Sequence, residues 1–243
     1  METIIYFART PEAGYGKTRL RSVLSEEQIY SIVKKLYDDL LEILTHTAHD
    51  VVIHYDGKDP FLPLPGVRQV DADLGKRMAE AIRSQIDKGP VVLLGCDLLG
   101  VDETLLEEAF RLLKTKDVVL APAEDGGYGI IGMSRFVDVF SSITYSRPDV
   151  LEKTMERAKK VGASVGLLPT IRDIDVFEDL LRERLKSPVA EKSSDAYGTL
   201  YTAANGNRLW ILNRKDKHPP SSSFYSPTTM FPFFHCIQTK ETK

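Results

Sequence analysis

The sequence contains little cysteine, no long apolar run and no large excess of one charge. Its two cysteines, Cys96 and Cys236, are too few for a disulfide framework. No apolar run approaches the roughly 18 residues of a membrane span, and charged residues interrupt the first 20 positions, where a signal peptide would lie. The 35 acidic and 32 basic residues give a net charge of −3, which argues against a large nucleic-acid-binding surface. We therefore expect a cytoplasmic protein with no membrane span and no nucleic-acid partner.

The chain does contain enough apolar material for a sizeable core. It has 243 residues, of which 42% are hydrophobic, and this length favours one domain or slightly more. The charge is unevenly distributed, because residues 187–243 carry a net charge of +3 and residues 1–186 carry −6. The basic region is also rich in serine and proline. We therefore predict a folded domain over residues 1–186 and an irregular C-terminal extension, a candidate for flexibility, over residues 187–243.

Short apolar runs alternate with amphipathic stretches throughout residues 1–186. The apolar runs predict strands at residues 3–8, 51–55, 91–94, 118–121, 128–133 and 165–168. Helical spacing predicts helices at residues 25–44, 74–87, 102–114, 148–162 and 175–185, the first of them begun by a capping box of Ser25 and Gln28. This alternation is typical of an α/β fold with a mostly parallel sheet flanked by helices. Ligands of such sheets bind beyond the carboxyl ends of the strands.

Basic residues and glycines follow the first expected strand. Backbone N–H groups and cations at the start of a helix favour a phosphate, which makes four residues candidates for phosphate or nucleotide binding: Arg9, Gly16, Lys17 and Arg19. The segment is similar to a P-loop, but Pro11 stands where the first glycine of that motif belongs and has no N–H to donate. A basic surface turn is the alternative interpretation.

Two aspartates are candidate metal ligands. Asp97 follows the strand at residues 91–94, and a carboxylate in that place can hold a divalent cation or cap the next turn. Asp175 is a candidate for the second ligand. Asp175 and Glu178 also have the spacing of a helix cap and its capping-box partner, so the sequence leaves both interpretations of Asp175 open.

Glycines are concentrated at residues 126–129, around Tyr128. Glycines in a strand indicate close approach of the backbone to a ligand, or a tight hairpin turn. Asp125, directly before them, could act as a base or hold a hydroxyl-rich substrate. The segment at residues 71–78 is either a capped helix start or a loop that contacts a nucleotide.

Taken in order, these segments resemble a known family. The resemblance is carried by residues 7–11, 16–20, 73–78, 95–97, 122–128 and 173–180. The set is similar to the bacterial glycosyltransferase-like proteins associated with arsenosugar biosynthesis, a branch of the GT-A nucleotide-diphospho-sugar transferase superfamily. The similarity extends over about residues 3–185 and does not cover residues 187–243.

The resemblance implies a Rossmann-like GT-A domain that transfers a sugar from a nucleotide-diphosphate donor to a small hydroxyl acceptor. It implies that Lys17 and Arg19 contact phosphates, and that Asp97 and Asp175 hold Mg²⁺ or Mn²⁺, which would neutralise the leaving diphosphate. Further residues implied on the nucleotide side are Asp73, Gly75 and Arg77. Asp125 would position or deprotonate the acceptor hydroxyl. The acceptor or sugar would lie against Gly126, Gly127 and Tyr128.

Three other functions are compatible with the sequence. The nearest is a nucleotidyltransferase of the same fold, which would release pyrophosphate from a nucleoside triphosphate. The second is a P-loop-like NTPase with Lys17, Thr18 and Asp97 in the Walker positions. The third is a protein that binds sugar nucleotides without turnover. The sequence does not predict the donor base, the sugar, the acceptor, the stereochemistry or the oligomeric state.

Overall fold

The computed structural model describes residues 1–14, 16–58, 64–185, 189–194, 198–203, 208–212 and 236–237. The chain divides into two compact units, one of residues 1–12 and 33–173 and the other of residues 13–32 and 174–243, and the boundary between them falls inside helix α1 (Glu26–His46). Composition instead indicated a division near residue 187, and that domain boundary stays a prediction. In the described part of the chain, no helix is long and apolar enough to cross a membrane.

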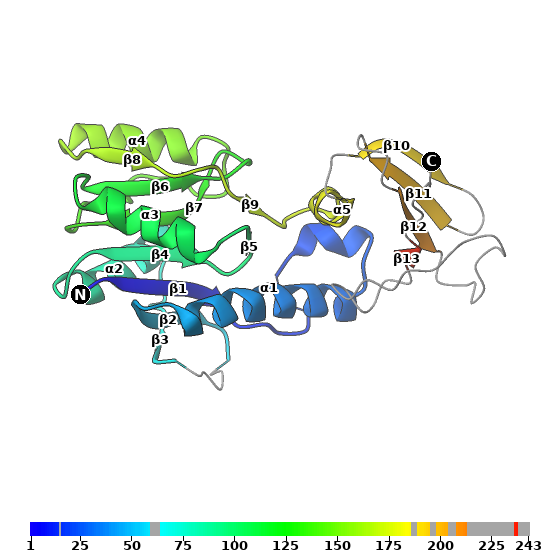
Figure 1. Ribbon diagram of the computed structural model, residues 1–243, viewed down its shortest axis with the longest axis horizontal. Coiled ribbons are helices and arrows are strands. Elements are labelled where there is room, and N and C mark those ends of the chain that lie inside the picture. Colours follow the sequence, from blue (N-terminus) through cyan, green and yellow to red (C-terminus); the bar gives the residue numbers. More distant parts are fainter. Residues whose placement is uncertain are drawn as a thin grey trace. The chain divides into compact units, whose positions relative to one another are not determined.

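The first unit is built on a seven-stranded sheet with the order β3-β2-β1-β4-β7-β6-β8 (Figure 1). Its strands are β1 (Thr3–Arg9), β2 (Asp50–Asp56), β3 (Gly66–Arg68), β4 (Val91–Gly95), β6 (Val118–Pro122), β7 (Tyr128–Met133) and β8 (Val165–Leu167). Neighbouring strands are parallel except at β7, which is antiparallel to both β4 and β6. The predicted α/β fold with a mostly parallel sheet is confirmed.

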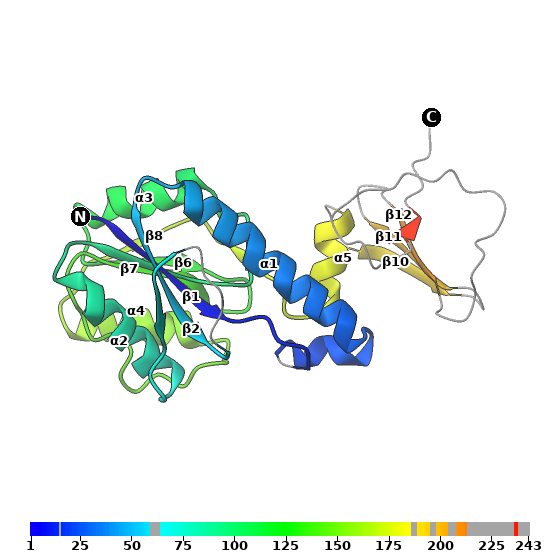
Figure 2. The ribbon, with the colours of Figure 1, turned by 90° about the horizontal axis from the view of Figure 1, so that it is seen from below.

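Helices cover both faces of this sheet (Figure 2). Helices α1 and α3 (Glu103–Leu113) pack on one face, and α2 (Leu74–Ile86) and α4 (Val150–Lys160) pack on the other. Strand β1 shows the cause, because Ile4 and Tyr6 lie in the core under α1 and α3 whereas Ile5 lies in the core under α2 and α4. Successive side chains of a strand point to opposite faces, so an uninterrupted apolar run is buried on both.

Two of the helices begin as their local sequence predicts. The backbone N–H of Ser25 donates to Oε1 of Gln28 at 2.9 Å, and the N–H of Gln28 donates to Oγ of Ser25 at 3.3 Å, which is the predicted capping box of α1. Asp102 caps α3, since its Oδ1 accepts from the N–H of Leu105 at 2.8 Å.

Several short elements lie outside the predicted set. In the first unit, β5 (Leu98–Leu99) pairs antiparallel with β9 (Arg172–Asp173). The second unit contains a 3₁₀ helix outside the predicted set, η1 (Thr18–Ser22), and helix α5 (Phe177–Leu185), which confirms the helix predicted at residues 175–185. It also contains an antiparallel sheet in the expected irregular extension, formed by β10 (Val189–Ser194), β11 (Gly198–Ala203), β12 (Arg208–Leu212) and β13 (Cys236–Ile237).

Candidate functional site

In the first unit, charged side chains meet at the carboxyl ends of β1 and β2. Arg9 ends β1, Asp56 ends β2, and the two residues are register partners in the parallel pair. Nη2 of Arg9 lies 3.4 Å from Oδ2 of Asp56, and Nη1 of Arg77, from α2, lies 2.7 Å from the same oxygen. One carboxylate therefore holds two of the three arginines that were predicted to contact a nucleotide or its phosphates, Arg9 and Arg77. Asp56 was missed because its sequence context, Asp56-Gly57, signals only a turn.

The Asp56 carboxylate remains ionised in this setting. Partial burial raises its pKa, but the hydrogen bonds and positive charges of Arg77 and Arg9 outweigh burial and hold the pKa below its usual value. The Arg77 guanidinium is held more firmly than that of Arg9, because its Nε also donates to the carbonyl of Ala72 at 2.7 Å. Arg9 is about half exposed, with 48% of its side chain accessible, whereas 23% of Arg77 is accessible.

Gln69 links this cluster to the sheet. Its Nε2 donates to the carbonyl of Ala8 at 3.1 Å and to that of His54 at 2.8 Å, so one amide group joins the ends of β1 and β2. Its Oε1 accepts from Nη1 of Arg77 at 3.5 Å. Gln69 was not predicted, because no periodicity or motif marks a side chain that hydrogen-bonds to the ends of two strands.

The first loop is fastened to the end of β2. Both the backbone N–H and the Oγ1 of Thr10 donate to the carbonyl of Asp56, at 2.9 and 3.1 Å. The carboxylate of Glu12 accepts from the N–H of Lys58 at 2.8 Å. Gly57, with φ +107°, makes this contact feasible, since a Cβ there would lie 2.1 Å from Oγ1 of Thr10. The start of the loop after β1 is thus a fixed support for Arg9.

The predicted nucleotide-side residues of α2 have clear structural roles. Asp73 caps the helix, with its Oδ1 accepting from the N–H of Lys76 at 3.0 Å. Gly75 is needed for packing, because a Cβ on it would lie 2.8 Å from Cε2 of Tyr145. These contacts explain why the residues suit α2, and they leave their predicted contacts with a nucleotide untested.

Asp97 lies between β4 and β5, as its sequence position predicts. Its neighbour Leu98 is the register partner of Asp173 in β9, so a distant aspartate lies beside the Asp97 segment. Asp175, the predicted second metal ligand, belongs to the other unit. Among the residues that the structure describes, no group of three or more His, Cys, Asp or Glu side chains is placed to hold a metal ion.

The glycine-rich segment forms a tight turn between β6 and β7. Gly126 has φ +87°, and a Cβ on it would lie 2.0 Å from the carbonyl oxygen of Pro148. Oδ1 of Asp125 accepts from the N–H of Gly127 at 2.9 Å, within the turn itself. A Cβ on Gly129 would lie 2.4 Å from Leu98. Close contacts within the chain therefore explain why glycine is required at positions 126 and 129. The predicted contacts of the turn with an acceptor or sugar stay predictions.

Tyr128 extends from this turn into a small group of buried hydroxyls. The hydroxyl oxygens of Tyr128, Tyr145 and Thr154 are all buried, and none makes a hydrogen bond of normal geometry within the described ranges. Burial, followed by the neighbouring Tyr128, raises the pKa of Tyr145, so this phenol stays neutral. Tyr145 also packs on Gly75 and therefore connects the glycine turn with the start of α2.

The second unit carries its own charged cluster. Lys17 precedes η1 and has a left-handed backbone, with φ 41° and ψ 44°. Its Nζ lies 3.9 Å from Oδ1 of Asp175, and Nη1 of Arg19 pairs with Oδ2 of the same carboxylate. The structure thus brings together the two predicted phosphate ligands and one predicted metal ligand. Gly16, one residue before Lys17, also has a positive φ, of +79°.

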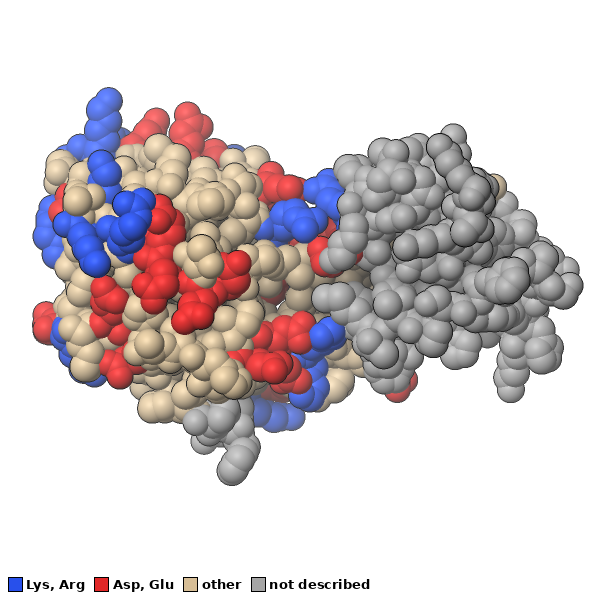
Figure 3. Space-filling model, in the orientation of Figure 1, with Lys and Arg blue, Asp and Glu red and all other residues tan. Residues whose placement is uncertain are grey.

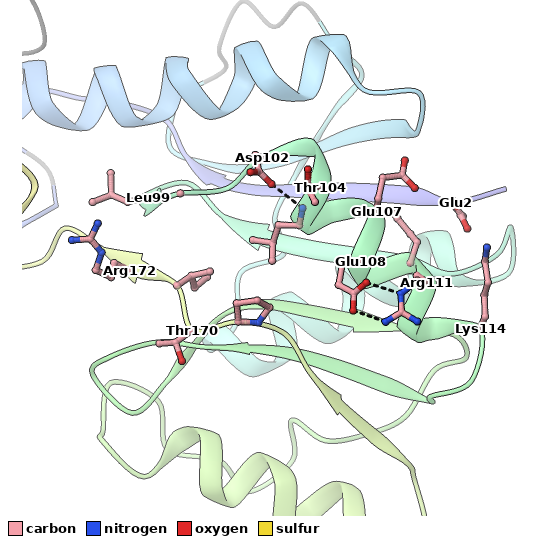
Figure 4. A pocket seen from close by; sticks show the side chains of 15 residues that line it. Glu2, Leu99, Asp102, Thr104, Glu107, Glu108, Arg111, Lys114, Thr170 and Arg172 are labelled. Atoms are coloured by element: carbon pink, nitrogen blue, oxygen red, sulfur yellow. Dashed lines mark hydrogen bonds and ion pairs between the residues drawn. The ribbon is translucent and has the colours of Figure 1, made fainter. Parts of the chain in front are cut away.

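A separate hollow of about 870 Å³ runs along α3 (Figure 4). Its charged residues are largely paired already: Arg111 binds Glu108 through two bonds of 2.6 Å, and His49 contacts Glu107 at 3.0 Å. None of the residues predicted for the site lines it. Figure 3 likewise shows acidic and basic side chains intermixed over the visible face of the first unit. We therefore place the candidate site at the strand ends and not in this hollow.

Comparison with known proteins shows a family similarity over part of the chain and corrects the expected activity. The family described as "Uncharacterized protein conserved in bacteria (DUF2064)" matches residues 41–147. A crystal structure from Desulfovibrio desulfuricans G20, provisionally described as a nucleotide-diphospho-sugar transferase, is 30% identical, with a TM-score of 0.70 over 75% of this chain and 85% of that one. The 2-phospho-L-lactate guanylyltransferase of Methanopyrus kandleri is 28% identical over 189 residues, which are 74% of this chain and 90% of the relative.

The guanylyltransferase overturns the expectation of sugar transfer, because a relative that aligns over nearly its whole length transfers a nucleotidyl group. The same comparison favours the nucleotidyltransferase alternative. The narrower resemblance to the arsenosugar-associated branch stays a prediction. Residues 41–147 are similar to the DUF2064 family, and the chain shares the fold of a nucleotide-diphospho-sugar transferase-like protein.

Proposed function

We propose that this protein is a nucleotidyltransferase that moves a nucleoside monophosphate from a nucleoside triphosphate to a small anionic acceptor, with release of pyrophosphate. The observation that carries the proposal is the alignment with a guanylyltransferase over 90% of that relative's length. The fold, shared at a TM-score of 0.70 with a nucleotide-diphospho-sugar transferase-like protein, supports it.

The charges at the site suit such a substrate. A triphosphate becomes more negative at its leaving end as the bond between the α- and β-phosphates breaks, and fixed cations stabilise that charge. Arg9, at the carboxyl end of β1, has 48% of its side chain exposed to solvent. In the second unit, Lys17 and Arg19 form a cationic pair of their own that could also contact a phosphate.

The reaction is a substitution at the α-phosphorus. An oxygen of the acceptor attacks that phosphorus, a new P–O bond forms, and the bond to the β-phosphate breaks, with pyrophosphate leaving. If the attacking oxygen belongs to a phosphate, it is already ionised near neutral pH and requires no general base. This fits the position of Asp125, one oxygen of which is engaged by the N–H of Gly127. The proposal therefore assigns Asp125 to the shape of the turn and not to proton transfer.

The carboxylates of Asp97 and Asp175 suit Mg²⁺ or Mn²⁺ better than zinc. Both are hard oxygen donors, and the described part of the chain offers no larger cluster of His, Cys, Asp or Glu. Mg²⁺ is typically bound by one or two carboxylates together with substrate phosphates and water. When bound, such an ion would neutralise charge on the phosphates. Asp97 is the residue that would hold it in the first unit.

Pyrophosphate release tests the proposal. Purified protein is incubated with Mg²⁺, each of the four nucleoside triphosphates in turn, and 2-phospholactate or another small phosphorylated acid. We expect pyrophosphate only when triphosphate and acceptor are both present. Asp97→Asn should lower the rate of pyrophosphate release at least about 100-fold, since it removes a charged ligand of the cation. Asp87→Asn is the control: Asp87 lies at the C-terminal end of α2, and its replacement should leave the rate unchanged. Release of inorganic phosphate without an acceptor, or a full rate in Asp97→Asn, would contradict it.

A further inference from the structure

Asp175 lies at the centre of a charge cluster that is complete without any ligand. Its Oδ1 faces Nζ of Lys17 at 3.9 Å, and its Oδ2 pairs with Nη1 of Arg19. The Lys17 side chain is largely buried, with 12% accessible, whereas Asp175 is 40% accessible. A solvent-facing carboxylate thus occupies the same two cations that we assign to phosphate binding.

The Asp175 carboxylate is not the group that accepts the N–H groups at the start of α5. The first N–H groups before α5 are served by another residue, because Oδ2 of Asp179 accepts from the N–H of Asp175 at 2.9 Å and from that of Val176 at 2.8 Å. Asp175 therefore does not act as the cap that its sequence context also allowed. Its side chain is directed at Lys17 and Arg19 instead.

The backbone of Lys17 is held in an unusual conformation at the same place. Its φ of 41° is in the left-handed region, which is unfavourable for a non-glycine residue. Such a conformation persists when surrounding contacts favour it. The ion pair with Asp175 is one contact of the Lys17 side chain at this place.

We propose that Asp175 makes this cluster selective for a triphosphate that carries a divalent cation over one that is free. This inference rests on the proposed function, since it takes Lys17 and Arg19 as phosphate ligands. A free polyphosphate must displace the carboxylate from both cations and is then repelled by it. A polyphosphate with its cation exchanges partners: its oxygens replace Asp175 on Lys17 and Arg19, while Asp175 faces the divalent ion. No carboxylate is left unpaired in the second case.

Binding of inorganic tripolyphosphate, measured by calorimetry at low salt on the full chain, tests this selectivity without any turnover. In EDTA, Asp175→Asn should bind tripolyphosphate about three- to tenfold more tightly than wild type, because the ion pairs of Asp175 with Lys17 and Arg19 no longer compete. Adding Mg²⁺ should strengthen binding by wild type much more than binding by Asp175→Asn. A carboxylate that acts only as a metal ligand would leave binding in EDTA unchanged.

Two further variants separate this mechanism from a general change in charge. Glu26→Gln removes one negative charge from the same unit, where Glu26 pairs with Arg21 at 3.1 Å, and it should bind as wild type does. Adding Lys17→Met to Asp175→Asn should abolish the tighter binding. Asp175→Ser provides a second replacement, and far-ultraviolet circular dichroism establishes that each variant is folded.

The inference is overturned if Asp175→Asn or Asp175→Ser binds tripolyphosphate in EDTA no more tightly than wild type, or if Glu26→Gln tightens binding equally. It is also overturned if no form of the protein binds tripolyphosphate, because Lys17 and Arg19 would then not be phosphate ligands. Pyrophosphate release by wild type is measured separately. If wild type releases pyrophosphate but no form of the protein binds tripolyphosphate, the inference fails and the proposed function stands. If wild type releases no pyrophosphate but Asp175→Asn binds tripolyphosphate more tightly than wild type, the proposed function fails and the inference about Asp175 stands.

Discussion

Nη1 of Arg77 lies 2.7 Å from Oδ2 of Asp56, and this ion pair joins the first turn of α2 to the carboxyl end of β2. The same oxygen also faces Arg9 at the end of β1. Helix α2 and the two strands therefore depend on one half-buried carboxylate. The contact shows how an α/β sheet builds its ligand-facing edge, since parallel strands bring their carboxyl ends together there.

Replacing Asp56 should weaken the fold through this pair. Asp56→Asn keeps the shape but removes the charge, and we expect it to lower the free energy of unfolding by about 1–2 kcal/mol, because a hydrogen bond between charged groups is lost from a partly buried place. Urea denaturation at pH 7 measures it. Glu80→Gln is a matched control, because the exposed pair of Glu80 with Arg83 at 2.8 Å should contribute less than about 0.5 kcal/mol.

The effect of Asp56 should also depend on pH. Its pKa is lower in the folded protein than in the unfolded chain, so its contribution is present above the unfolded pKa and is lost as pH falls through the folded value. The difference between wild type and Asp56→Asn should therefore shrink below about pH 4. A difference that stayed constant down to pH 2 would show that the charge of Asp56 is not its source.

His54 should make the protein sensitive to mild acid. Burial lowers its pKa from 6.5 to about 4, and the side chain is 4% exposed. Between about pH 6.5 and pH 4, His54 is protonated in the unfolded chain and neutral in the folded protein. The free energy of unfolding therefore falls as pH drops through this range, by up to about 3 kcal/mol. His54→Leu should remove this loss, whereas His46→Leu at an exposed position should retain it. The measurement is the free energy of unfolding of each protein between pH 7 and pH 4. If it fell equally with pH in wild type and in His54→Leu, the prediction would be contradicted.

Gly126 should tolerate no side chain. Its φ is +87°, and an added Cβ would lie 2.0 Å from the carbonyl oxygen of Pro148. Gly126→Ala should therefore lower the free energy of unfolding by about 3 kcal/mol or more, from backbone strain and displacement of the segment before α4. Gly100→Ala is the matched control, because Gly100 has φ +76° but open space around it, and strain alone costs about 1–2 kcal/mol. Equal losses in the two variants would mean that the contact with Pro148 contributes nothing.

The elements that the sequence predicted are those encoded over a few neighbouring residues. The capping box of α1 joins residues three positions apart, and the buried strands appear as continuous apolar runs. Strands β3, β5 and β9 were not predicted, and each contains only two or three residues. They are strands only because a partner segment lies beside them.

Some residues of the candidate site were predicted, but the ion pairs and hydrogen bonds that join them were not. Arg9 and Asp97 were singled out because they follow strands, and Arg77 because the family resemblance implied it. Asp56 and Gln69 were not, since Arg9 and Asp56 are 47 positions apart and Gln69 reaches Ala8 across 61. Contacts at such separations are created by the pairing of strands and leave no periodic signal.

The sequence by itself determined the alternation of strands and helices, the capped starts of α1 and α3, and the placement of charge after the strands, because each depends on local hydrogen bonds and on the period of apolar residues. Only the tertiary structure decided that Asp56 holds two arginines and that Asp175 faces Lys17 and Arg19 in place of capping α5. Those choices rest on long-range electrostatics and packing, which bring together charges that the chain keeps far apart.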